Sequence, residues 1–255
     1  MAYDGGKITL SIPVNKQRPP LISVCMATYN GERFVEQQIA SILCQLESDD
    51  ELIISDDGSV DTTCSILKSF DDPRILMVAN PNPGSPIRNF EHALRHARGN
   101  LVFLADQDDV WEHNKIAVQA GLLDKFDLVV SDCCLIDTNG ALLADSFFDL
   151  HGSGSGFFKN LYKNSFLGCC MAFRRSVLEK SLPFPPAIAM HDIWIGLLAE
   201  LCGTTYFCPD KLVRYRRHSN TASTAGGKSS LSMPRQISYR CQFLFAVASR
   251  LVAGR

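Results

Sequence analysis

The sequence has none of the long apolar runs from which membrane-spanning helices are built, because no segment approaches about 18 uninterrupted apolar residues. It does not open with a basic region followed by an apolar run, so we expect no secretory signal peptide. The ten cysteines include no C-x-x-C spacing, which argues against a zinc site and favours reduced core thiols in a cytoplasmic protein. Since the formal net charge is only −2, we expect no general affinity for nucleic acid.

What the first half does contain is a regular alternation of short apolar segments and helical patterns. Apolar residues at helical spacing follow each of four expected strands, which lie at 21–30, Leu52–Ile54, Arg74–Ala79 and Leu101–Ala105. This alternation predicts an α/β fold with a mixed, mainly parallel sheet and helices on both faces. We place one domain at 21–225, after a loose leader at 1–20.

Two of these strands end in clusters of carboxylates. The clusters are Asp56 and Asp57 after the second strand, and Asp106, Asp108 and Asp109 after the fourth. The carboxyl ends of parallel strands share one edge of a sheet, so we expect the two clusters to converge there. Such oxygen ligands suit a hard divalent cation that also holds phosphates. For the second cluster the alternative is a helix N-cap with an acidic first turn, in a helix that begins near Trp111.

The second half has a less regular pattern. It predicts strands at Asp127–Asp132, Phe166–Phe173, Thr204–Phe207 and Leu212–Tyr215, with a hairpin turn at Asn139–Gly140. His191 and Asp192 open an almost wholly apolar and therefore buried helix that Gly203 closes. Asp192 is either the N-cap of that helix or a general base that faces a substrate hydroxyl.

The C-terminal segment 226–255 is expected to form a basic amphipathic tail. Its cationic and apolar members are Arg235, Arg240, Arg250 and Arg255 among Phe243, Leu244, Phe245 and Leu251. This pattern is compatible with an interfacial helix that touches the inner face of the cell membrane or a lipid-linked acceptor. A helix packed on the domain is the alternative.

Seven motifs, in this order and at these spacings, together resemble the family 2 glycosyltransferases. They are ISVCMATYN, IISDDGSVDTT, PIRNFEHALRHARGN, FLADQDDVW, FLGCCMAFRR, MHDIW and RYRRHSN, and they span roughly residues 20–225. The similarity is greatest to the bacterial rhamnosyltransferase-like branch, which builds O-antigen and other surface polysaccharides. The resemblance implies a GT-A fold, a dTDP- or UDP-sugar donor, Mg²⁺ or Mn²⁺, inversion at the anomeric carbon, and a saccharide or lipid-linked saccharide acceptor.

The resemblance also implies a role for each matching residue. Residues 21–111 form the nucleotide-binding half, in which the expected donor contacts are Ala27, Thr28, Tyr29, Asp56, Asp57, Arg88, Asp106 and Gln107. Residues 112–225 form the acceptor half, with an acceptor-side wall from Gly168 to Met171 that includes Cys169, and with His191 and Trp194 nearby. Asp108 and His218 match metal-binding positions, and Asp192 matches the catalytic base.

Two departures from the family pattern bear on mechanism. The base motif is His-Asp here, where many members have Glu-Asp, so the partner of the base is open. The QxxRW motif and membrane helices of the polymerising members are absent from the sequence, which favours transfer of a single sugar. The competing classes are a sugar-nucleotidyltransferase, a non-catalytic nucleotide-sugar-binding protein and a response-regulator-like domain. A nucleotidyltransferase usually has a Gly-rich loop after its first strand, whereas this chain reads ATYNGER.

Overall fold

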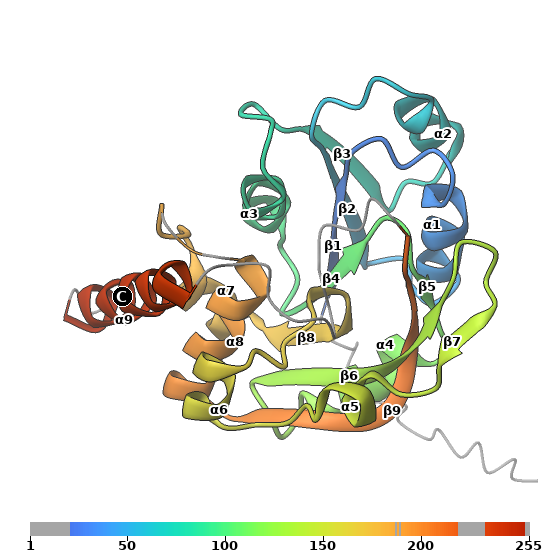
Figure 1. The fold of residues 1–255 in the computed structure, drawn as a ribbon. Coiled ribbons are helices and arrows are strands. Elements are labelled where there is room, and N and C mark those ends of the chain that lie inside the picture. The colour runs from blue at the N-terminus through green and yellow to red at the C-terminus, as the bar shows by residue number, and fades with distance from the viewer. Residues whose placement is uncertain (1–20, 187, 189, 219–232, 253–255) are drawn as a thin grey trace, which may run out of the picture.

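The computed structural model describes residues 21–186, 188, 190–218 and 233–252. The predicted leader and residues 226–232 and 253–255 of the predicted tail therefore lie outside the described residues. The described part forms a nine-stranded sheet in the order β3-β2-β1-β4-β8-β6-β9-β5, with β7 paired to β6. Helices lie on both sides of the sheet (Figure 1). The predicted α/β class is confirmed.

The strands are β1 Ile22–Thr28, β2 Glu51–Asp56, β3 Ile75–Ala79, β4 Leu101–Asp106, β5 Val110–Trp111, β6 Leu128–Ile136, β7 Leu142–Ala144, β8 Met171–Arg174 and β9 Thr205–Arg216. The helices are α1 Val35–Leu43, α2 Thr63–Ser69, α3 Pro86–His96, α4 Lys115–Leu122, α5 Phe147–His151, α6 Phe157–Tyr162, α7 Arg175–Ser181, α8 His191–Cys202 and α9 Met233–Val252. A 3-10 turn, η1, covers Gly168–Cys170.

The first four strands form the parallel half of the sheet. β1 lies in its centre and pairs in parallel with β2 on one side and with β4 on the other. α3 covers one face of these strands and α1 the other (Figure 1). Because both faces are covered, almost every residue of β1, β2 and β4 is buried, as their uninterrupted apolar sequences predict.

The second half adds β8 in the antiparallel direction between β4 and β6. The hairpin predicted at Asn139–Gly140 is present, because β6 and β7 pair across it in the antiparallel direction. The two short strands expected at Thr204–Phe207 and Leu212–Tyr215 are instead one strand, β9, whose register shifts against β6 near Asp132. The strand expected over Phe166–Phe173 is also wrong in its first part, where η1 precedes β8.

One expected helix start is wrong as well. Trp111 lies in β5, which pairs with β9, and the following helix begins only at Lys115. A distant segment supplies the partner of Trp111, which a local sequence pattern does not reveal.

α8 is buried on nearly every side, as its apolar sequence predicts. α6 and α7 pack beside it, and α9 covers its outer face through an edge contact between Trp194 and Phe243. Phe243 and Val247 are buried, so α9 packs on the domain, and the expectation that Phe243 belongs to a membrane-facing surface is wrong. Leu244 and Phe245 of the same helix are exposed, while the side chain of Leu251 lies outside the described residues.

The cysteines and the lengths of the helices bear on the expectations of core thiols and of no membrane-spanning segment. All ten cysteines are free thiols, of which Cys25, Cys133, Cys169, Cys170 and Cys208 are buried. The remaining five are partly or fully exposed, so the expectation of core thiols is only half right. Among the described residues, no helix is long and apolar enough to span a bilayer.

Candidate active site

The two aspartate clusters flank the end of β1. Thr28 is paired with Asp56 of β2, and Ala27 is paired with Asp106 of β4. Since neighbouring strands lie about 4.7–4.9 Å apart, the two acidic strand ends are separated by roughly 10 Å of backbone. The structure therefore brings both clusters to one edge of the sheet, around Ala27 and Thr28.

Asp56 and Asp57 shape the first cluster in different ways. The Asp56 carboxylate accepts hydrogen bonds from Thr28 Oγ1, from Ser59 Oγ and from the Gly58 and Ser59 amides. Burial opposes ionisation of Asp56, but the hydrogen bonds from Ser59 and Thr28 hold its pKa below the usual value. Asp57 accepts 2.6 and 2.8 Å hydrogen bonds from Asn80 Nδ2 and the Gly84 amide. Asp56 thus stabilises the turn, while Asp57 links it to the loop before α3.

Gln107 ties the second cluster to the first strand end. Its Oε1 accepts a hydrogen bond from the Tyr29 amide, and its Nε2 donates to the Tyr29 carbonyl oxygen. Gly31 lies so close that a Cβ there would come within 2.3 Å of the Gln107 amide oxygen. Gln107 therefore fixes the backbone of Tyr29, whose side chain is exposed.

The second cluster concentrates negative charge in a buried place. Burial, with repulsion from Asp108 and Asp192, raises the pKa of Asp106 to about 8, and burial raises the pKa of Asp109 well above its usual range. One Asp109 oxygen accepts a hydrogen bond from the Arg216 amide, and the other has no partner among the described residues. Carboxylates held this close fit a divalent cation, which would offset their repulsion.

The structure offers two sets of possible metal ligands, and only one of them is the set expected from the sequence. Asp108 Oδ2 lies 2.7 Å from His218 Nε2, so these two predicted metal residues form a pair. Ligand atoms of Asp106, Asp109 and Cys169 lie within 4.8 Å of one another. Burial raises the pKa of the Cys169 thiol, so two carboxylates are the oxygen donors of this second set.

Arg216 is a residue whose role sequence reasoning missed. Its amide donates to Asp109, and its guanidinium donates to the carbonyl oxygens of Asp108, Asp137 and Thr138 and to Gln37 Oε1. The guanidinium carbon also lies 4.6 Å from the centre of the Phe34 ring. Arg216 therefore holds the loop that carries Asp108 and Asp109 against β9. The arginines that precede His218 in the motif RYRRHSN indicated a basic segment, but the sequence does not show which of them points into the protein.

We predict that Arg216→Lys lowers the free energy of unfolding by about 1.5–3 kcal/mol, because an ammonium group cannot reproduce the planar set of donors. Urea denaturation should show a lower midpoint at an unchanged m-value. Arg214→Lys is the matched control on the same strand, since the exposed ion pair of Arg214 with Glu112 should contribute about 1 kcal/mol or less. Equal losses in the two variants would contradict this role of Arg216.

Lys115 is a second residue that the sequence did not identify. It is fully buried, its Nζ donates 2.9 Å to the Cys169 carbonyl oxygen, and it lies 4.7 Å from the centre of the Trp111 ring. Gln119 Nε2 donates to the Cys170 carbonyl oxygen in the same way. The two α4 side chains anchor η1 beneath the aspartate cluster, and Lys115 places a buried positive charge close to it.

His191 and Asp192 begin α8 beside η1. Burial raises the pKa of Asp192 to about 6, although the amides of Ile193 and Gly168 oppose the shift. The His191 ring stacks on Phe90 of α3 with centres 4.0 Å apart, and burial lowers its pKa to about 3. A Cβ on Gly168 would lie only 3.2 Å from His191 Nε2. Gly168, His191 and Asp192 are therefore neighbours, as expected for the acceptor side.

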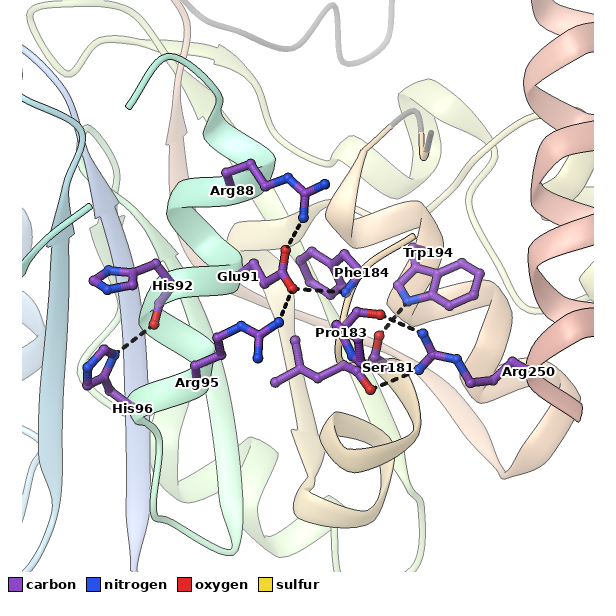
Figure 2. Close-up of polar contacts among 11 residues, drawn as sticks. Arg88, Glu91, His92, Arg95, His96, Ser181, Pro183, Phe184, Trp194 and Arg250 are labelled. Atoms are coloured by element: carbon purple, nitrogen blue, oxygen red, sulfur yellow. Dashed lines mark hydrogen bonds and ion pairs between the residues drawn. The ribbon is translucent and has the colours of Figure 1, made fainter. Parts of the chain in front are cut away.

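Two predicted site residues occupy other surroundings. Trp194 has 0% exposure, donates from Nε1 to the Ser181 carbonyl oxygen and faces α9, so the structure does not bring it to the acceptor side. Arg88, on the first turn of α3, pairs with the buried Glu91, which also binds Arg95 and the Phe184 amide (Figure 2). Glu91 thus joins α3 to the segment that precedes α8, and Arg88 is its ion-pair partner on the same helix.

Solved structures of nucleotide-sugar enzymes share this fold. S. aureus TarS 1-349 in complex with UDP-GlcNAc superposes with a TM-score of 0.67 at 18% identity, over 91% of this chain and 66% of that chain. The mannosyltransferase PcManGT from Pyrobaculum calidifontis, in complex with GDP-Man and Mn²⁺, gives a TM-score of 0.60 at 19% identity, over 93% of this chain and 80% of that one. The sheet with its acidic strand ends is accordingly a GT-A fold.

The family follows from sequence relatives. A family model described as Glycosyl transferase family 2 matches residues 23–182, and the chain belongs to that family. TuaG of Bacillus subtilis strain 168, named for teichuronic acid biosynthesis, is 28% identical over 83% of this chain and 84% of its own. An Escherichia coli enzyme, UDP-Glc:alpha-D-GlcNAc-diphosphoundecaprenol beta-1,3-glucosyltransferase WfgD, is 26% identical over 80% of each. The chain is a glycosyltransferase rather than a nucleotidyltransferase, a binding protein or a response regulator.

Proposed function

We propose that the protein transfers one sugar, with inversion, from a nucleotide-diphosphate donor to a hydroxyl of a surface-polysaccharide acceptor. The observation that carries the proposal is the position of Asp192, a buried carboxylate at the start of α8. It lies close enough to Asp106 at the end of β4 for charge repulsion between the two carboxylates to help raise the pKa of Asp106. A donor-side carboxylate cluster and one separate carboxylate are what a single displacement requires.

The donor side is assigned to the edge of the sheet around β1. The backbone at Ala27 and Thr28 and the Asp57 turn form the base and ribose pocket, while Gln107 keeps Tyr29 at its mouth. Asp108, with Asp106, Asp109 or His218 beside it, would hold a divalent cation, and such a cation would offset the negative charge that develops on the diphosphate as the glycosidic bond breaks. The chain's own contribution is Arg216, which holds the cluster, since Arg88 is paired with Glu91 of α3.

The acceptor side is assigned to η1 and the start of α8. The acceptor hydroxyl gives its proton to Asp192 as its oxygen attacks the anomeric carbon, and the bond from that carbon to the diphosphate breaks on the opposite face. His191 stays neutral at physiological pH because burial disfavours its charged form. It therefore serves as an uncharged wall of the acceptor pocket beside Gly168.

The donor has to be identified by a binding experiment, because the relatives are named for, or were solved with, different nucleotide sugars. TarS was solved with UDP-GlcNAc, PcManGT with GDP-Man, and WfgD is named for UDP-Glc, whereas the sequence resemblance suggests a dTDP- or UDP-sugar that carries rhamnose or another hexose. A thermal-shift screen of dTDP-rhamnose, UDP-glucose, UDP-galactose, UDP-GlcNAc and GDP-mannose with Mn²⁺ tests the proposal. A true donor at 100 times its Kd adds about 2.7 kcal/mol to the free energy of unfolding. If none of them stabilises the protein, the proposal is wrong.

We also propose that the enzyme works at the inner face of the cell membrane, where α9 touches the bilayer through Leu244 and Phe245. Because α9 covers Trp194, deletion of the tail would uncover the core, so point variants are the sharper test. Leu244→Glu with Phe245→Glu should lower binding to vesicles of anionic phospholipid by more than about tenfold, since burial of one such side chain contributes about 1.5–3 kcal/mol. Flotation measures the bound fraction.

Val60→Glu provides the control for that experiment. Val60 is 87% exposed in the loop before α2, at the other end of the molecule from α9 (Figure 1). It should leave the floated fraction unchanged. If the α9 variant floats as well as the unmodified protein, α9 does not touch the bilayer.

A further inference from the structure

A thiol and two carboxylates from distant parts of the chain meet at the carboxyl end of β4. Asp106 is the last residue of β4, Asp109 directly precedes β5, and Cys169 lies in η1. One ligand atom of each side chain lies within 4.8 Å of the other two. Asp109 and Cys169 are fully buried, whereas Asp106 is partly exposed. The cluster therefore has two enclosed ligands and one side that solvent can reach.

Two buried polar atoms near the cluster have no hydrogen-bond partner among the described residues. One is Oδ2 of Asp109, a residue with 0% exposure whose Oδ1 accepts from the Arg216 amide. The other is the hydroxyl of Tyr215 on β9, which is 2% exposed. Burial, followed by the charges of Cys169 and Asp109, raises the pKa of Tyr215, which places its hydroxyl near the cluster. Because an unpartnered buried polar atom costs free energy, both atoms favour a bound ligand here.

Negative charge is in excess at this place. The carboxylates that act on one another are those of Asp106, Asp108, Asp109 and Asp192. The buried cations beside them in the described part of the chain are Lys115 and Arg216. Lys115 Nζ donates to the Cys169 carbonyl oxygen, and the Arg216 guanidinium donates to the Asp108 carbonyl oxygen. Since four carboxylates face two cations, the ligand that this place favours is a further cation.

The thiol determines which cations fit the cluster. Mg²⁺ and Mn²⁺ prefer oxygen ligands, whereas Zn²⁺, and Cd²⁺ likewise, accept a thiolate together with carboxylates. Ligand atoms around a tetrahedral zinc ion lie roughly 3.3–3.8 Å apart, given bond lengths of about 2.0–2.3 Å. From the present limit of 4.8 Å, a closure of about 1 Å brings the three ligand atoms onto one ion. The fourth position would be left to water.

We infer that Asp106, Asp109 and Cys169 form a second cation site, which takes a thiophilic divalent ion of the Zn²⁺ type. On binding, the Cys169 thiol gives its proton to solvent and its sulfur joins the ion, while the carboxylates supply oxygen ligands. The ion connects the end of β4 to η1, and thus the donor edge to the acceptor-side wall. Asp108 lies between the two aspartates in sequence, so occupation also holds the loop that we assign to the donor metal. This site goes beyond the proposed function and does not depend on which sugar is transferred.

Cd²⁺ is the probe for sulfur ligation, because a cadmium–thiolate bond gives an ultraviolet charge-transfer band that carboxylates and imidazoles do not give. One equivalent is added to the metal-free chain, in which the exposed Cys44 and Cys241 are replaced by alanine. We expect the band in this chain and in its Cys25→Ala variant, and about a tenth of it or less with Cys169→Ala. Cys25 is the matched control, because it is also a free thiol with 0% exposure and its charged neighbours are Glu51 and Arg175.

Calorimetry gives the affinities. Cys169→Ala should weaken Zn²⁺ binding by at least about tenfold and change Mn²⁺ binding by less than about twofold, because manganese prefers oxygen to sulfur. Asp109→Asn keeps an acceptor for the Arg216 amide but loses the charge. It should also weaken Zn²⁺ binding by at least about tenfold, while the cadmium–sulfur band remains at saturating Cd²⁺.

Three results would overturn the inference. The first is the absence of the cadmium band from the chain that retains Cys169, which needs no further variant. The second is an equal band in Cys169→Ala and Cys25→Ala. The third is Zn²⁺ binding that Asp108→Ala abolishes and Cys169→Ala preserves, since Zn²⁺ would then occupy the pair of Asp108 and His218.

The binding of UDP with Mn²⁺ separates this inference from the proposed function. If the unmodified chain binds no nucleotide while the cadmium band depends on Cys169, the proposed function fails and the second cation site stands. If nucleotide binding is intact and the band does not depend on Cys169, the inference of a second site alone fails.

Discussion

Replacement of Asp192 by asparagine is expected to lower turnover by roughly 10²–10⁴-fold, the usual contribution of a general base. Asparagine nearly preserves the shape of the side chain but cannot accept the proton of the acceptor hydroxyl. The dissociation constant for UDP should change little, because we assign Asp192, at the start of α8 with Gly168 and His191, to the acceptor and not to the diphosphate. Turnover is measured with acceptor present, and UDP affinity without it.

The same residue predicts the pH dependence of the reaction. Burial raises the pKa of Asp192 to about 6, so the carboxyl is protonated and inactive as a base below that pH and ionised above it. The rate should therefore rise tenfold per pH unit below about pH 6, which is the acid limb of the profile, and should level off above that pH. That limb should be absent from the residual activity of Asp192→Asn.

The alternative bases are weaker candidates in this structure. His191 has its pKa lowered to about 3 by burial, so its neutral ring is a poor proton acceptor near neutral pH. Asp109 is fully buried and accepts a hydrogen bond from the Arg216 amide. If Asp192→Asn instead weakens UDP binding strongly and leaves turnover at saturation intact, Asp192 belongs to the donor site and these two residues must be tested.

The parts of the fold that the sequence predicted are those in which local pattern and burial agree. Leu101–Ala105 and Leu52–Ile54 are apolar throughout because α helices cover both faces of β4 and β2. Their terminal aspartates cannot be buried without compensation, so the strand ends could be identified without a structure. α8 was predictable for the same reason, since a helix that is apolar on every side has to be enclosed.

The parts that escaped prediction depend on partners distant in the sequence. Trp111 pairs with Val213 across the sheet, and Arg216 reaches back to the loop of Asp108 and Asp109, so neither the short strand β5 nor the role of Arg216 follows from neighbouring residues. The burial of Lys115 could not be predicted, because a lysine on an amphipathic helix is ordinarily exposed. Trp194 was expected on the acceptor side because it follows Asp192 in sequence. In the structure its side chain lies on the face of α8 that packs against α9.

Asp108→Ala is expected to remove the dependence of UDP binding on Mg²⁺ or Mn²⁺, with a loss of metal-dependent affinity of at least 10–100-fold, the range found when even an outer-shell partner is removed. Mn²⁺ binding followed by paramagnetic resonance and UDP binding followed by calorimetry measure the metal and the nucleotide separately. The physical reason is that the diphosphate and the carboxylate cluster repel each other unless a cation lies between them.

The structure makes that experiment more discriminating, because it offers two ligand sets. Asp108 is paired with His218, whereas Asp106, Asp109 and Cys169 converge within 4.8 Å. We expect Asp108→Ala to abolish Mn²⁺ binding, His218→Gln to weaken it and Cys169→Ser to leave it nearly unchanged, since Mg²⁺ and Mn²⁺ prefer oxygen to sulfur. If Asp109→Asn abolishes Mn²⁺ binding while Asp108→Ala retains it, the metal is bound by the buried pair Asp106 and Asp109. Asp108 would then serve only to hold His218 in place.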